Sequence, residues 1–127
     1  MQAAAPRLAR DIATAHGLTA TAEFVDGYPV TSNDAAELQF AEETVAAVAG
    51  EGRYIAAPDP LTGSEDFSYV LEQVPGAFLM LGACPPDADP FTAPFNHSAE
   101  AVFDDAVLPD GTAVYAELAL RRLAQAG

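Results

Sequence analysis

Apolar positions recur every three or four residues in four parts of the chain, and this spacing predicts four helices. The first covers residues 3–16, where Leu8, Ile12 and Ala15 share one face, and it ends at His16-Gly17. The second is predicted to run to about Ala49 after N-cap residues in Val30–Asp34, the third from Ser64 to before Pro75, and the last from Pro109 to about Ala124.

Between these helices, three stretches have the pattern of strands. Residues 18–25 alternate apolar and polar side chains, which predicts a half-buried strand, and residues 53–57 form a shorter candidate. Residues 77–82 are continuously apolar, as in a strand buried on both faces of a sheet that helices cover. The pattern therefore predicts an α/β fold. The first helix and strand are too small to bury their own faces, so their sheet should continue upstream or in a partner.

Composition adds several exclusions. The chain has 127 residues, 50% of them hydrophobic, which suits one domain with a core. A net charge of −14 argues against nucleic-acid partners and against anionic membrane surfaces. No apolar run approaches the roughly 20 residues of a membrane span, and no secretory signal pattern begins the chain, so we expect a cytoplasmic protein. The single Cys84 excludes an internal disulfide.

His97 is the sharpest candidate for chemistry. It lies in a loop between predicted elements and is followed by Glu100, Asp104 and Asp105. A histidine beside carboxylates is a common setting for a metal ligand, but a loop histidine can equally be a hydrogen-bonded structural residue. Cys84 could pair with His97 as nucleophile and base, or it could be a small buried apolar residue.

A second candidate is the segment Gly63, Ser64, Glu65 and Asp66. Two acids in the first turn of a helix complement its dipole and need no site to explain them. The other interpretation is a pocket wall, because a glycine allows a close approach to the backbone. Both interpretations remain open on these residues alone.

Five segments in order carry a resemblance to a known family. They are Gly27–Asp34, Gly63–Ser68, Pro75–Gly82, Asn96–Ser98 and Phe103–Gly111. The resemblance extends over nearly the whole chain. The chain resembles the C-terminal part of the di-metal amidohydrolases and metallopeptidases that include hippurate hydrolases, indole-acetyl-amino-acid hydrolases, aminoacylases and related carboxypeptidases.

This resemblance implies a fold and a domain division. Residues 1–26 would be the last helix and strand of a ferredoxin-like lid that also mediates dimerisation, and residues 27–33 the hinge. Residues 34–127 would be the C-terminal lobe of a mixed-sheet, zinc-exopeptidase-like catalytic domain. A homodimer through the lid is implied for the complete enzyme.

The resemblance also implies an activity and a site. His97 matches one metal ligand, and Gly63, Ser64, Glu65 and Asp66 match a segment beside the substrate. The other ligands and the glutamate general base would lie upstream. The implied reaction is hydrolysis of the amide bond of small N-acyl amino acids with two divalent ions, Zn or Mn, per complete site. We expect this chain to be an inactive fragment by itself. The alternative is a free-standing acidic α/β binding module without catalysis.

Overall fold

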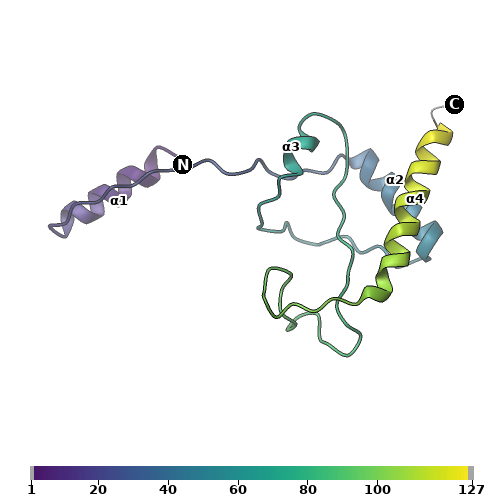
Figure 1. Ribbon diagram of the computed structural model, residues 1–127. Coiled ribbons are helices and arrows are strands. Elements are labelled where there is room, and N and C mark those ends of the chain that lie inside the picture. Colours follow the sequence, from purple (N-terminus) through teal and green to yellow (C-terminus); the bar gives the residue numbers. More distant parts are fainter. Residues whose placement is uncertain (1, 126–127) are drawn as a thin grey trace.

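The structure is a computed structural model that describes residues 2–125. This range contains four α-helices, α1 (Ala4–Ala15), α2 (Ala35–Ala49), α3 (Ser68–Leu71) and α4 (Leu108–Gln125), and the short 3-10 helix η1 (Asp105–Val107). Figure 1 shows α2 and α4 packed together. The helix η1 leads directly into α4. Long irregular segments connect the other elements.

Residues 2–125 contain no β-strand, so the predicted mixed-sheet α/β fold is wrong. The three predicted strands, residues 18–25, 53–57 and 77–82, have no regular secondary structure. A strand exists only when another segment pairs with its backbone, and an apolar sequence does not supply that segment. Single backbone hydrogen bonds join distant segments without forming a ladder. Asp34 N–H donates to Gly76 O at 2.9 Å, and Asp104 N–H donates to Ala83 O at 2.9 Å.

Three of the four predicted helices are confirmed, and two of their ends, the start of α2 and the end of α1, have the expected residues. The Asp34 carboxylate accepts hydrogen bonds from the N–H groups of Ala36 and Glu37 at 2.9 and 3.1 Å, which satisfies free donors at the start of α2. Helix α1 is followed by Gly17 at φ +70°, a left-handed conformation that suits glycine.

The third helix begins later than predicted, and Ser64 is not its N-cap. Helix α3 covers only Ser68–Leu71. The preceding turn closes around Glu65, whose carboxylate accepts the N–H of Phe67 at 3.0 Å and whose carbonyl accepts the Ser68 hydroxyl at 2.6 Å. Glu65 thus supplies locally the acceptor that the sequence pattern assigned to Ser64.

Helices α2 and α4 form the best packed part of the molecule, here called the α2–α4 pair. Glu37, Phe40, Ala41 and Thr44 lie three or four positions apart and therefore share one face of α2. From α4, Arg122 forms an ion pair with Glu37, and its guanidinium carbon lies 4.1 Å from the centre of the Phe40 ring. Ala41 and Thr44 are the buried residues of α2.

The remaining apolar side chains are largely uncovered. Among the described residues Ala41 is the one buried hydrophobic residue, although half of the sequence is hydrophobic. The accessible surface is 10185 Å², against roughly 6,400 Å² for a compact monomer of this mass. Met80 and Leu81, predicted to be buried, are 61% and 54% exposed. The chain therefore presents much of the apolar surface that a folded domain would bury.

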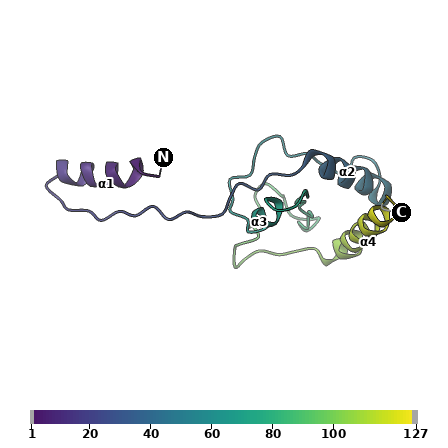
Figure 2. The same ribbon diagram turned by 90° about the horizontal axis from the view of Figure 1, so that it is seen from above.

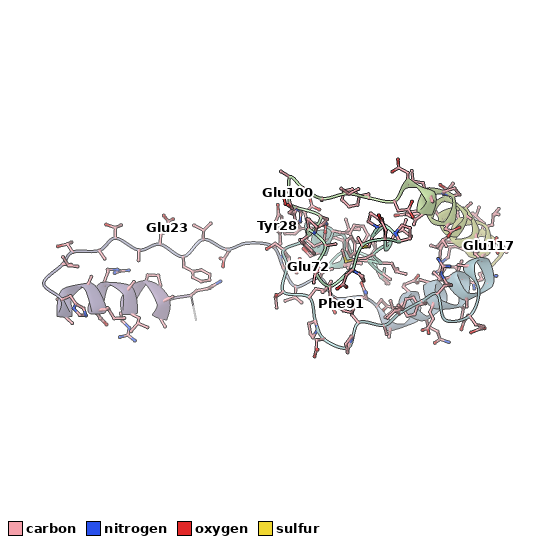
Figure 3. All side chains as sticks on the ribbon, turned by 90° about the horizontal axis from the view of Figure 1, so that it is seen from below. Glu23, Tyr28, Glu72, Phe91, Glu100 and Glu117 are labelled. Carbon is pink, nitrogen blue, oxygen red and sulfur yellow. The ribbon has the colours of Figure 1, made fainter. Side chains whose placement is uncertain are left out.

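Residues 2–32 are here called the arm, which projects away from the rest of the molecule up to Tyr28, where it meets the body (Figures 1 and 2). The arm consists of α1 and an extended segment that returns beside it, and the Gln2 side chain donates a hydrogen bond to Asp26. Figure 3 shows Glu23 midway along the arm and Tyr28 where the arm meets the body. The division at residues 26 and 33 stays a prediction. No helix described here has the length and apolarity to cross a membrane.

Candidate functional site

His97 lies in an exposed turn of the long loop between α3 and η1. The turn is closed by a hydrogen bond from Ser98 N–H to Phe95 O at 2.8 Å. The imidazole lies beside the Phe95 ring, with 5.7 Å between ring centres and 53° between the planes. This geometry holds the imidazole at the surface, where it is accessible to a ligand.

The described residues do not form a metal site by themselves. In residues 2–125 no three His, Cys, Asp or Glu side chains gather closely enough to hold an ion. Asp104, one of the nearby acids, accepts the N–H of Ala106 at 2.9 Å and so caps η1 instead. Because metal ions need several fixed ligands, no catalytic step can be assigned to an ion held by this chain alone. The role of His97 as one ligand stays a prediction.

The segment Gly63–Asp66 forms an exposed approach to α3. A Cβ added to Gly63 would meet no atom within 4 Å, so the space beside this residue is open. The Glu65 carboxylate is half-buried and already bonded to Phe67, whereas Ser64 and Asp66 are exposed. The segment therefore has an open face, and its role as a pocket wall stays a prediction.

The predicted site residues are not brought into contact with one another. Within residues 2–125 no hydrogen bond, ion pair or ring contact joins His97 to Gly63–Asp66. The thiol of Cys84 makes a long contact of 3.8 Å with Ala88 O instead of one with His97. The hypothesis of a Cys84–His97 nucleophile and base therefore receives no support.

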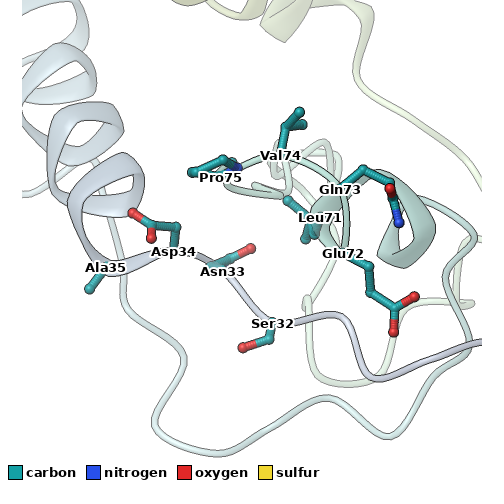
Figure 4. A pocket seen from close by; sticks show the side chains of 10 residues that line it. Ser32, Asn33, Asp34, Ala35, Leu71, Glu72, Gln73, Val74 and Pro75 are labelled. Carbon is teal, nitrogen blue, oxygen red and sulfur yellow. The ribbon is translucent and has the colours of Figure 1, made fainter.

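The sequence did not predict a hollow of about 500 Å³ at the base of the arm (Figure 4). Its lining consists of residues 32–35, at the start of α2, and residues 71–76, at the end of α3. The Asp34 carboxylate on its wall is already used to cap α2. Asn33, also on the wall, forms two hydrogen bonds with the backbone of Phe78. Only contacts between distant segments create this hollow, which is why no local pattern indicated it.

Comparison with known proteins finds one matching family and several similar proteins. Residues 5–121 match the family described as Peptidase family M20/M25/M40. The chain is 32% identical to IAA-amino acid hydrolase ILR1-like 4 of Arabidopsis thaliana over 108 residues, which are 82% of this chain and 24% of that protein. It is 30% identical to ILR1-like 6 of the same plant over 111 residues, which are 84% of this chain and 23% of that protein.

A bacterial relative matches as well. The chain is 33% identical to the protein named "Putative amidohydrolase YhaA" of Bacillus subtilis (strain 168) over 76 residues, which are 60% of this chain and 19% of that protein. The chain thus spans about a quarter or less of the length of the curated relatives it matches. No solved structure matches the chain.

Proposed function

This chain belongs to Peptidase family M20/M25/M40, and we propose that it forms the C-terminal part of a metal-dependent amidohydrolase that cleaves N-acyl amino acids. The observation that carries this proposal is the family match over residues 5–121. The names of two plant relatives support the substrate class, because both are named as IAA-amino acid hydrolases.

The proposal assigns His97 as one ligand in a site that other parts of the enzyme complete. An exposed imidazole in a closed turn suits this role, because it is held in place yet accessible from outside the chain. Two ions, Zn or Mn, belong to the complete site, and Gly63, Ser64, Glu65 and Asp66 contact the substrate.

The domain division is part of the same proposal. Residues 1–26 belong to a lid and dimerisation domain, residues 27–33 to the hinge, and residues 34–127 to the catalytic domain of a cytoplasmic homodimer. Separation of α1 from the α2–α4 pair supports a boundary near the base of the arm (Figure 1).

The uncovered apolar surface favours this proposal over a free-standing acidic module. A module that folds alone must bury its own apolar side chains, because that burial is the main favourable term in folding. Val30, Ile55 and Phe91 are 85%, 84% and 94% exposed. We infer that the rest of the enzyme covers such side chains.

The proposal is tested by amide hydrolysis in the complete enzyme. His97→Ala is expected to lower the turnover of an N-acyl amino acid by at least about a hundredfold, since even residues that only orient metal ligands contribute 10–100-fold. His16→Ala is the matched control, an exposed histidine at the end of α1, and should leave turnover unchanged. Equal turnover in the two variants would contradict the proposal.

A further inference from the structure

Two separate contacts attach the arm to the body. The ring of Tyr28 meets the ring of Tyr69 in α3 edge to face, with 5.7 Å between centres and 73° between planes. The carboxamide of Asn33, just beyond the arm, pairs with Phe78, since Nδ2 donates to Phe78 O at 3.2 Å and Oδ1 accepts Phe78 N–H at 2.8 Å.

The Asn33 contact depends on the chemistry of an amide. One side chain satisfies both the donor and the acceptor of the Phe78 backbone, as a neighbouring strand would. An aspartate at this position could accept from the N–H but, when ionised, could not donate to the carbonyl. The adjacent hydrogen bond from Asp34 N–H to Gly76 O, at 2.9 Å, joins the same two segments.

The partners of both contacts, Phe78 and Tyr69, lie next to the turn that closes around Glu65. The Phe78 ring lies 5.8 Å from the ring of Phe67, centre to centre, and the N–H of Phe67 is bonded to the Glu65 carboxylate. Tyr69 directly follows Ser68, which is fully buried and donates its hydroxyl to the Glu65 carbonyl. The turn at Glu65–Ser68 therefore touches, from two sides, the residues that hold the arm.

We propose that Tyr28 and Asn33 act as a latch that couples the position of the arm to the turn at Glu65–Ser68. When the arm moves away from the body, the Tyr28–Tyr69 and Asn33–Phe78 contacts break together. Phe67 then loses the support of Phe78, and the turn opens. This coupling holds whether or not the turn lines a substrate pocket, so it does not depend on the proposed enzymatic function.

Amide hydrogen exchange in the complete protein that contains this chain tests the latch residue by residue. In Asn33→Ala, exchange at Phe78 and at Phe67 is expected to quicken by about tenfold, the effect of losing two hydrogen bonds of ordinary net strength. Asn33→Asp should give a smaller rise at both positions, because it keeps one of the two bonds. Tyr28→Ala should quicken exchange at Phe67, and Tyr28→Phe, which keeps the ring, should not.

The control is Val30→Ala, a change at an 85% exposed side chain between the two latch residues, which should alter none of these rates. A rise at Phe78 without a rise at Phe67 would overturn the coupling, because the arm would be anchored but not linked to the turn. An equal rise at Gly50, at the end of α2, would overturn it too, since the change would then be a general loss of stability. Absence of protection at Phe78 in the unchanged chain would also contradict the latch.

Discussion

The α2–α4 pair contains buried residues and contacts between helices, whereas the loops that carry the predicted site residues are exposed. The pair holds two of the three buried residues described in this chain, Ala41 and Thr44, and a cross-helix contact through Arg122. Gly63 and His97 lie on exposed segments. The α2–α4 pair is therefore the most stable part of the chain, and it contains no predicted site residue. The predicted site residues lie in loops that make few contacts with the rest of this chain.

This difference explains how one chain can match a family clearly while its predicted site residues stay apart. Packing between α2 and α4 needs only residues of this chain. A metal site needs several ligands in one place, and residues 2–125 do not gather them. Substitutions in the pair should therefore change stability, whereas substitutions in the loops should change binding and turnover.

The largest effect on stability is expected at Ala41. Ala41→Leu adds three carbon atoms at a side chain that is 3% exposed, and overpacking of this kind costs about 1–3 kcal/mol of unfolding free energy. Urea unfolding followed by circular dichroism measures the change. Ala47→Leu, at an exposed position of the same helix, should stay within about 0.5 kcal/mol. Similar losses for the two variants would mean that the face of α2 that carries Ala41 is not the packed one.

A smaller effect is expected at Arg122. Its side chain is 48% exposed, so its ion pair with Glu37 is weakened by solvent, but it also covers the Phe40 ring. Arg122→Ala should cost about 1 kcal/mol. Arg121→Ala, which removes an ion pair with Glu117 inside α4, should cost no more than about 0.5 kcal/mol. If the two losses are equal, Arg122 does not join the helices.

Local signals predicted the helices well, and contacts between distant segments explain the errors. Asp34, Gly17 and Pro109 mark helix ends through their own backbone and side-chain chemistry, so the sequence reveals α1, α2 and α4. The predicted strands failed because pairing depends on a second segment that no local pattern can supply.

For the candidate site, too, the sequence indicated what depends on local segments and missed what depends on contacts between distant ones. Family membership could be predicted because it rests on ordered segments, and residues 5–121 match the family. The Asn33–Phe78 pairing joins residues 45 positions apart, so no pattern in the sequence indicated it. The turn around Glu65 was also missed, because the carboxylate of Glu65 replaced Ser64 as the local acceptor.

The metal content of the complete enzyme tests the role of His97 most directly. Atomic emission should find clearly less bound Zn or Mn per chain in His97→Ala than in the unchanged enzyme or in His16→Ala. With the metal removed by a chelator, the unfolding free energy of both variants should stay within about 0.5 kcal/mol of that of the unchanged enzyme, because both histidines are exposed in this chain, so a lower metal content cannot come from misfolding. Lower metal content in His97→Ala alone is the predicted result, and equal metal content in all three proteins would contradict the assignment of His97 as a ligand.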